Sequence, residues 1–281
     1  MARAVLRQVA ALDGLARFAI CLLLFFLFLS MFGSWLPIGD PEEIGAGARL
    51  AAPSLEFPLG TDELGRSFLP RAIEGIRTTF LLSTVAVLIT ALLGTAIGMI
   101  AAYRRGRVDL LLMRFTDVLF AFPAIVLGLL VSALLGTGIV PAMCVISIAT
   151  LPLFIRLVRA VSLVVASREF VIVAEVAGAP MRRVLLVHIL PNIMGAIVVQ
   201  LTYAISIGML IESGISFLGL GTQPPHSSLG SLLRLGAAYL TTAPWLTLSA
   251  GILLSLIIAS VNLLGDGLRD YIEPLDPRPL T

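Results

Sequence analysis

Glu212 is an acidic residue in a long apolar stretch, and an ionisable side chain in a membrane-spanning segment is costly enough to be a functional candidate. It follows Pro191 by about 20 residues, or about 30 Å of helix, which puts it near the far end of that stretch. With Ser213 and Ser216 it would either line a polar cavity or anchor the end of a helix.

Asp117 is a second acidic residue of this kind, at the start of another apolar stretch. Arg114 precedes it by three residues on the same helical face, which favours an ion pair at the membrane surface over a role in transport. Cys21 and Cys144 also lie in apolar stretches and show no CxxC or other metal-binding spacing, so we interpret both as buried, inert thiols.

The composition excludes several kinds of catalysis. All 19 basic residues are arginine, so the lysine that a phosphate-binding G-x-x-x-x-G-K-[ST] loop or a Schiff base needs is missing. Neither an H-E-x-x-H nor a G-x-S-x-G motif occurs. His188 and His226 are far apart and on opposite predicted sides, so we expect no metal site. We therefore expect a protein that is not an enzyme.

The elements that position these residues are predicted to be membrane helices. The chain has 281 residues, of which 58% are hydrophobic and 13% charged, with a mean hydropathy of +1.04, far from the composition of soluble domains. A bilayer core of about 30 Å needs about 20 helical residues, and the uncharged runs predict six spans. These runs lie between Arg17 and Asp40, Arg77 and Arg104, Asp117 and Arg156 (double length), Pro191 and Glu212, and Arg234 and Asp266.

Glycine and proline residues in two of these runs indicate a turn and a close helix contact. Gly136, Gly138 and Pro141 predict the turn of a helical hairpin in the double run. Gly94 and Gly98 have the spacing at which two helices approach closely in lipid.

The arginines predict the orientation of the spans. With the N-terminus inside, 14 arginines fall on inner segments and 5 on outer ones, and basic residues near span ends are retained in the cytoplasm. We therefore expect both termini to be cytoplasmic. The apolar run after Arg3, Arg7 and Arg17 is 22 residues long, longer than the apolar region of a signal peptide, so we expect an uncleaved first span.

Two connections are too long to be simple turns between helices, an outer loop over residues 38–76 and an inner segment over residues 164–192. In the inner segment, a short helix over 169–177 is followed by Gly178, which can take a left-handed conformation, and by Pro180, which can start a second helix toward Pro191. Small residues in this helix would let a partner protein approach closely.

This inner segment resembles the cytoplasmic coupling loop of importer permeases of the ATP-binding cassette (ABC) class. That family's pattern is Glu-Ala-Ala, three residues, Gly, and an ending like Ile-x-Leu-Pro. The match falls on Ala174, Gly178, Ile189, Leu190 and Pro191, followed by Asn192. The chain departs from the pattern where Ile172 and Val173 replace the family's Glu and first Ala, and Glu175 lies three places after Ile172.

Four further motifs extend the resemblance over the chain from Phe57 onward. They are FPLGTDELGR at 57–66, FLGLGTQPP at 217–225, APW at 243–245 and NLLGDGLRD at 262–270. Together they resemble the second (C-type) permease subunit of dipeptide, oligopeptide and nickel importers. Within the first motif, glycines supply turns, and Asp62, Glu63 and Arg66 are local ion-pair partners. This loop is either a solvated lead-in to the next span or, as the resemblance implies, part of the extracytoplasmic side where a binding protein docks.

The resemblance implies an all-α polytopic protein of the bacterial inner membrane with the type I ABC importer permease fold. Residues 1–76 would hold the first span and the extracytoplasmic loop, and residues 77–281 a permease core of five spans. The implied partners are a homologous permease subunit in a heterodimer, two ATP-binding subunits that bind ATP and Mg, an extracytoplasmic substrate-binding protein and the lipid bilayer. We expect no nucleic acid, and no cofactor in this chain.

The resemblance and the residue patterns together nominate three groups of site residues. The ATPase-coupling group is Ala174, Glu175, Gly178, Ala179, Arg182, Arg183 and Pro191. The candidates for the translocation path are Glu212, Ser213 and Ser216. The extracytoplasmic motif is Gly60, Thr61, Asp62, Gly65 and Arg66.

The expected function is therefore that of a permease subunit of an ATP-driven importer for peptides or similar small solutes, working by alternating access. One alternative is a secondary transporter driven by an ion gradient, for which only Asp117 and Glu212 are available as ion ligands. A scaffold protein would explain the spans but not the shaped inner segment. Dipeptides, longer peptides, nickel chelates and other small peptide-like solutes all remain open as substrates.

Overall fold

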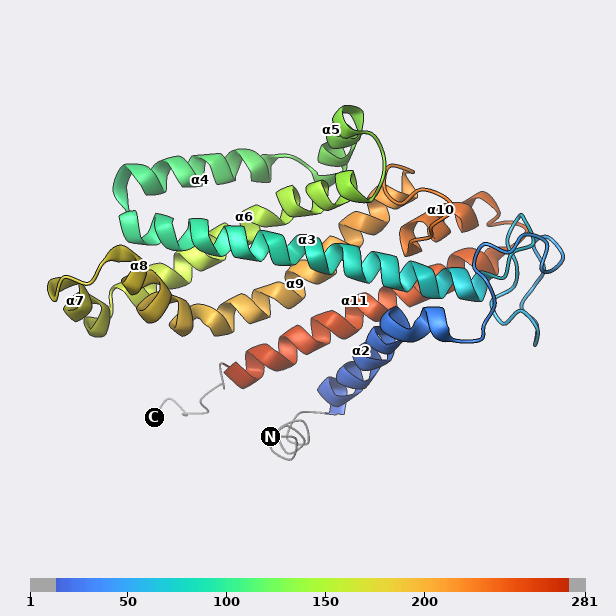
Figure 1. The fold of residues 1–281 in the computed structure, drawn as a ribbon, viewed down its shortest axis with the longest axis horizontal. Coiled ribbons are helices and arrows are strands. Elements are labelled where there is room, and N and C mark those ends of the chain that lie inside the picture. The colour runs from blue at the N-terminus through green and yellow to red at the C-terminus, as the bar shows by residue number, and fades with distance from the viewer. Residues whose placement is uncertain (1–13, 273–281) are drawn as a thin grey trace, which may run out of the picture.

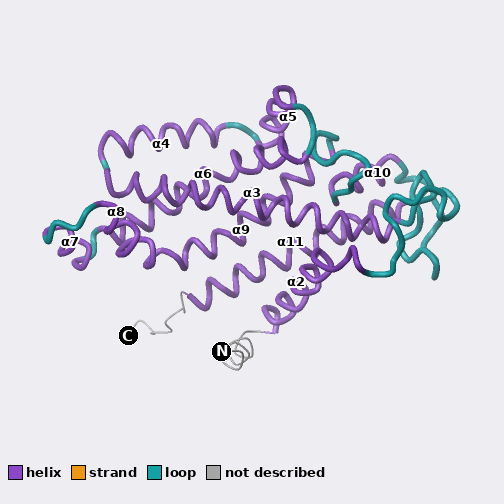
Figure 2. Tube along the Cα trace, in the orientation of Figure 1, coloured by secondary structure: helices purple, strands orange, loops and turns teal. Residues whose placement is uncertain are grey.

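The computed structural model describes residues 14–272, which form a bundle of helices and loops with no β-strand in that range (Figure 1; Figure 2). In chain order the elements are α2 (Gly14–Phe32), the 3-10 turn η1 (Gly33–Trp35), α3 (Phe68–Arg104), α4 (Gly106–Ala121), α5 (Ala124–Leu135), α6 (Ile139–Ala166), α7 (Glu169–Val176), α8 (Met181–Arg183), the π-helical turn η2 (Val184–Ile189), α9 (Leu190–Phe217), α10 (Leu229–Ala238) and α11 (Pro244–Ile272).

Within residues 14–272, four helices are long and apolar enough to cross a membrane alone: α3, α6, α11 and the continuous helix Met181–Phe217, which comprises α8, η2 and α9. The pair α4 and α5 would give a fifth crossing, but it is bent by 90°. The first predicted span corresponds to α2, whose apolar part Arg17–Phe32 measures only about 24 Å. The all-α, multi-pass fold is thus confirmed, whereas the third predicted span is not one straight helix.

Pro123 explains the bend between α4 and α5. Proline has no N–H to continue the helical hydrogen bonds, and it drives the preceding residue out of the helical conformation. Phe122 accordingly has φ −86° and ψ 124°. The predicted hairpin turn follows α5, where Gly136 and Gly138 both have positive φ.

The helix α3 packs closely along α6 through two glycines. A β-carbon on Gly94 would lie 2.5 Å from the β-carbon of Phe154, and one on Gly98 would lie 2.9 Å from the carbonyl oxygen of Ile155. A larger residue would force the two helices apart. The close approach that the glycine spacing predicts is confirmed.

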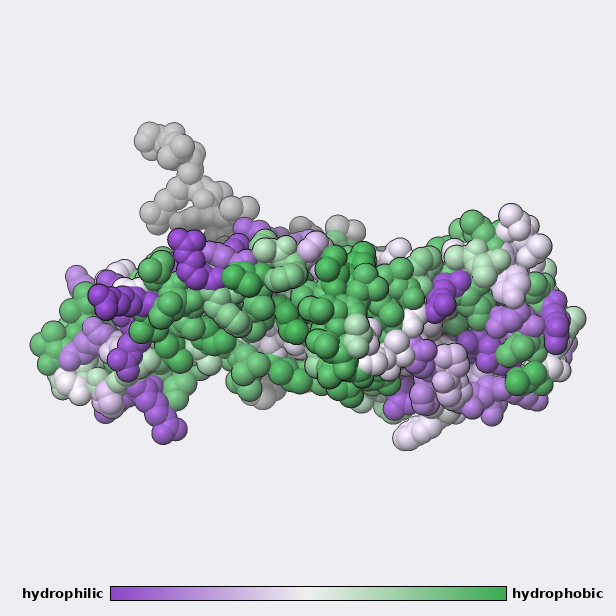
Figure 3. Space-filling view, turned by 90° about the horizontal axis from the view of Figure 1, so that it is seen from above, coloured by the Kyte–Doolittle hydropathy of each residue, from purple (hydrophilic) through white to green (hydrophobic). Residues whose placement is uncertain are grey.

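The two ends of the molecule are built from different segments. Figure 1 shows α7 and α8 at one end, with α10 and the loop before α3 at the other, and α3 running between them. An apolar band covers the middle of the surface and polar residues gather toward both ends (Figure 3). This distribution fits a protein that crosses a bilayer between two aqueous phases.

The cytoplasmic placement of both termini stays a prediction. Arg3, Arg7 and Arg278, which contribute to it, lie outside the described residues. The predicted division after residue 76 falls within α3, so the two parts share a helix.

Candidate functional site

The inner segment contains the short helix, the bend and the second helix that the sequence predicts. The Ala177 N–H donates to the Val173 carbonyl at 2.9 Å and closes α7. Gly178 then has φ +80°, a left-handed conformation that strains other residues. No described atom lies within 4 Å of a β-carbon placed on Gly178, so the need for glycine there is conformational. Across the bend, the Ala179 N–H donates to the Ala174 carbonyl at 3.0 Å.

The helix α7 presents an apolar surface at this end of the molecule. Val171 is buried against the neighbouring helices, whereas Val173 and Val176 are 66% and 85% exposed. Exposed charged residues flank this surface: Glu175, Arg182 and Arg183. An exposed apolar patch with a charged rim is typical of a protein-docking surface.

The second helix of the segment continues past Pro191, where the sequence suggested that it would end. It forms one helix over Met181–Phe217 with a π-helical turn at Val184–Ile189. Because proline lacks the N–H for a regular helical bond, the wider turn lets the helix pass this residue. The Asn192 side-chain amide donates to the His188 carbonyl at 2.7 Å and satisfies an acceptor at the turn.

Asp62 organises the opposite end of the molecule and is fully buried. Its Oδ1 accepts from the N–H groups of Leu64 and Arg66 at 2.8 and 2.9 Å. Its Oδ2 accepts from Arg66 Nε at 2.6 Å and also pairs with Arg71 of α3. The local pairing with Arg66 is confirmed, and Glu63 lies 3.5 Å from the same guanidinium. The interpretation of this loop as solvated is wrong for Asp62. The sequence did not point to Arg71 as a partner because Arg71 belongs to the following helix.

Two glycines let the loop around Asp62 fold onto its surroundings. Gly60 and Gly65 have φ +76° and +72°, and a β-carbon on Gly60 would lie 2.7 Å from Trp245 Nε1. Between them, the Thr61 hydroxyl accepts the Ala51 N–H at 2.8 Å. The motif is therefore a folded unit that holds the loop to the helices. That a binding protein docks there stays a prediction.

Glu212 is the second fully buried carboxylate. Its Oε1 accepts from the Ser216 hydroxyl at 2.7 Å, and its Oε2 accepts from the hydroxyls of Thr79 at 2.9 Å and Ser213 at 3.4 Å. The Thr79 hydroxyl in turn accepts the N–H of Leu229, the first residue of α10, at 3.0 Å. This network joins α3, α9 and α10 and supports the anchoring interpretation. The place of these residues in a translocation path stays a prediction.

Asp117 pairs with a different arginine from the one predicted. Its carboxylate lies 2.8 Å from Arg156 of α6 and is not paired with Arg114. Arg156 is 39 residues away in the sequence, so only the hairpin fold brings the two together.

The prediction that both cysteines are buried is wrong for Cys21, which is exposed on α2, while Cys144 is half-buried.

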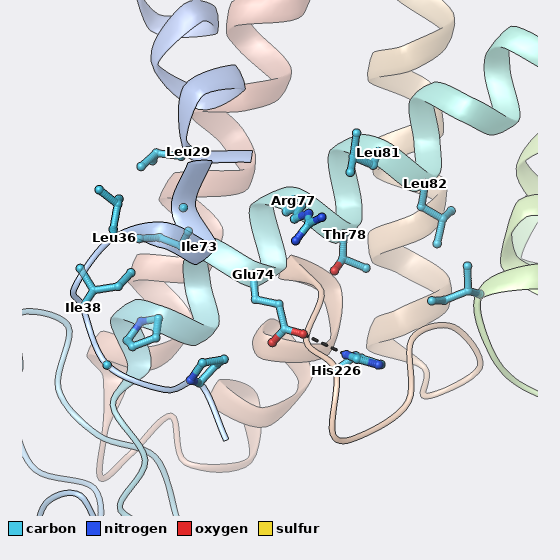
Figure 4. A pocket seen from close by; sticks show the side chains of 15 residues that line it. Leu29, Leu36, Ile38, Ile73, Glu74, Arg77, Thr78, Leu81, Leu82 and His226 are labelled. Atoms are coloured by element: carbon cyan, nitrogen blue, oxygen red, sulfur yellow. Dashed lines mark hydrogen bonds and ion pairs between the residues drawn. The ribbon is translucent and has the colours of Figure 1, made fainter. Parts of the chain in front are cut away.

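A cavity of about 470 Å³ lies between the end of α2, the first turns of α3 and the loop before α10 (Figure 4). Its walls are mainly apolar, with a polar side formed by Glu74, Arg77, Thr78 and His226. Glu74 Oε1 lies 3.1 Å from His226 Nδ1, while Glu74 Oε2 is buried without a hydrogen-bond partner among the described residues. No sequence motif marks Glu74, whereas His226 directly follows the FLGLGTQPP motif.

The described residues thus form a multi-pass helical bundle with an exposed apolar surface on α7 at one end and a folded, charge-stabilised loop at the other. Residues 94–275 match the family described as "Binding-protein-dependent transport system inner membrane component", and the chain belongs to that family. It is a multi-pass inner-membrane permease component of an ABC importer, which favours ATP-driven transport over the ion-gradient alternative.

Curated relatives are similar to this chain over most of its length. A putative peptide transport system permease protein of Brucella suis is 37% identical over 258 residues, which cover 92% of this chain and 87% of the relative. The di/tripeptide transport system permease protein of Pseudomonas aeruginosa is 35% identical over 90% of this chain and 85% of its own length. A glutathione transport system permease protein of Escherichia coli is 37% identical over 88% and 82%. The resemblance drawn from the motifs is thereby confirmed.

Proposed function

We propose that this chain is one of two homologous permease subunits in an importer of peptides or similar small solutes. It forms half of the translocation pathway and receives solute from an extracytoplasmic binding protein. Two separate ATP-binding subunits drive it by alternating access. The family description, which refers to binding-protein-dependent transport, supports this arrangement, and so do the relatives named for peptide, di/tripeptide and glutathione transport.

The observation that carries the proposal is the exposed apolar surface of α7, next to the Gly178 bend and the start of a membrane-crossing helix. An ATP-binding subunit is the partner that fits it, because this chain has no lysine for a phosphate-binding loop of its own. ATP and Mg are accordingly bound by the partner subunits. Glu175 and Arg182 offer charged contacts where the family's glutamate is replaced by Ile172.

Val176→Asp tests this docking surface because it places a charge in the middle of the apolar patch, where an unpaired charge in an interface is costly. We expect recovery of the ATP-binding subunits with tagged permease, and ATP-dependent uptake in proteoliposomes, to fall by about tenfold or more. Leu55→Asp is the matched control for subunit recovery, since Leu55 is fully exposed at the opposite end, and it should recover the ATP-binding subunits as the wild type does.

Two outcomes would contradict the proposal separately. Unchanged recovery of the ATP-binding subunits with Val176→Asp would show that α7 is not their docking surface. Uptake by the wild-type complex that continues without ATP, with the ion gradient held constant, would show that ATP does not drive transport.

A further inference from the structure

Two ion pairs join α4 to α6. Asp109 binds Arg159 through two hydrogen bonds of 2.5 and 2.6 Å, and these side chains are only 17% and 30% exposed. Asp117 lies 2.8 Å from Arg156, and these side chains are 50% and 45% exposed. The Arg156 guanidinium also lies over the Phe120 ring, 4.5 Å from its centroid. The first pair is shielded between the helices, whereas the second presents both charges outward.

The outward pair lies well away from the ends of α4 and α6 that are nearest to α7. Asp117 is about 16 Å along α4 from Gly106, and Arg156 is about 15 Å along α6 from Ala166. The two helices lie side by side along the long axis of the molecule (Figure 1). Because α4 runs back along α3 after Arg105, Asp117 lies level with the uncharged part of α3 between Arg77 and Arg104, which is long enough to cross a membrane.

Charges at this depth do not face lipid, because ionisable groups within the membrane lie toward the protein interior or a water-filled cavity. A long arginine side chain often extends to the nearest aqueous surface. Arg156 is instead held in place by Asp117 and by Phe120. Yet half of each charged side chain is uncovered by the described part of this subunit.

The break between α4 and α5 is a second, independent indication that this face of α4 does not lie against lipid. Phe122 and Pro123 lie outside the helices and are both exposed, and the Phe122 N–H reaches the Leu119 carbonyl at only 3.4 Å. Non-helical backbone at membrane depth occurs where protein buries it or where it lines a water-filled cavity. This break follows Asp117 by five residues, so exposed charge and non-helical backbone occur together.

We propose that the second half of α4, together with Arg156, lines the aqueous passage of the importer. In this proposal the Asp117–Arg156 pair is a charged binding site for the solute within that passage. This inference rests on the proposed function, because a passage requires a second permease subunit opposite. A peptide carries an ammonium and a carboxylate group. Asp117 can accept from the first, and Arg156 keeps guanidinium N–H groups free to donate to the second.

Cysteine accessibility in the assembled complex tests whether this face meets water. In a Cys21→Ser, Cys144→Ser background, Phe120→Cys keeps both charged residues and removes only the ring contact to Arg156, and Leu92→Cys is the control. Leu92 is 74% exposed on α3 at a similar depth, in an apolar surrounding. A charged, membrane-impermeant thiosulfonate should modify Phe120→Cys about tenfold faster than Leu92→Cys, because thiolate forms only in contact with water.

Equal, slow modification at both positions would overturn the proposal and would mean that a dry contact covers the pair. This readout does not depend on transport. Slow modification in a complex that still imports solute with ATP would therefore refute the passage while leaving the proposed function intact. Loss of ATP dependence with fast modification would refute only the proposed function.

A charge exchange, Asp117→Arg with Arg156→Asp, separates a solute contact from a structural clamp. We expect the exchanged protein to keep the thermal stability and subunit recovery of the wild type, because the pair is re-formed. We also expect its KM for a zwitterionic dipeptide to rise by about tenfold, because the order of charges along the passage is reversed. Full recovery of the wild-type KM would show that the pair is only a clamp.

Discussion

Asp62 and Glu212 are both fully buried carboxylates, but their surroundings stabilise them in different ways. Asp62 lies between two guanidinium groups, from Arg66 and from Arg71. Glu212 receives hydrogen bonds from hydroxyl groups. Removing one partner of a buried ion pair costs about 3–5 kcal/mol, whereas one hydrogen bond contributes about 1 kcal/mol. Asp62 is therefore the more sensitive of the two to a single substitution.

Asp62→Asn should destabilise the protein because it leaves the buried Arg71 and the partly buried Arg66 without their shared counter-charge. We expect the free energy of unfolding to fall by about 3 kcal/mol, together with faster proteolysis of the loop before α3. Glu56→Gln, an exposed position in the same loop, is the control and should change neither. Thermal unfolding in detergent and limited proteolysis measure the two effects, and an unchanged melting temperature for Asp62→Asn would contradict the buried network.

At the scale of elements, the contact between α3 and α6 depends on glycine. Gly94→Leu should lower the free energy of unfolding by about 1–3 kcal/mol because the added side chain meets Phe154 directly. Ala96→Leu, on the exposed side of the same helix, should have little effect. Melting temperatures of the two variants in one detergent provide the comparison. Equal values would mean that the helices do not pack as closely as described.

Local features of these elements could be predicted from the sequence, and their partners could not. Gly178 and Pro180 mark the bend after α7 because glycine permits a positive φ and proline fixes its own φ. Arg71 and Arg156 escaped prediction because they reach their acidic partners only after the helices pack. Pro123 carries a readable signal for the break in the third span, but the 90° angle depends on how α5 packs.

At the scale of the whole molecule, the charge distribution predicts that both termini and α7 share the cytoplasmic side. A reporter that is active only outside the cytoplasm should be inactive when fused after residue 281 and active when inserted in the outer loop after Pro53. An insertion after Gly178 should match the C-terminal fusion. Activity at the C-terminus would reverse the orientation and would place α7 where no ATP-binding subunit can reach it.

The continuous helix Met181–Phe217, with its π-helical turn at Val184–Ile189, joins the two ends of the subunit. Its 37 residues span about 55 Å, from the Gly178 bend to the hydroxyl network that holds α10. Tilting an element of that length by about 10° around its midpoint moves its two tips by about 5 Å in opposite directions. Under the proposed function, we therefore expect a displacement of the inner tip to widen one mouth of the subunit while it narrows the other.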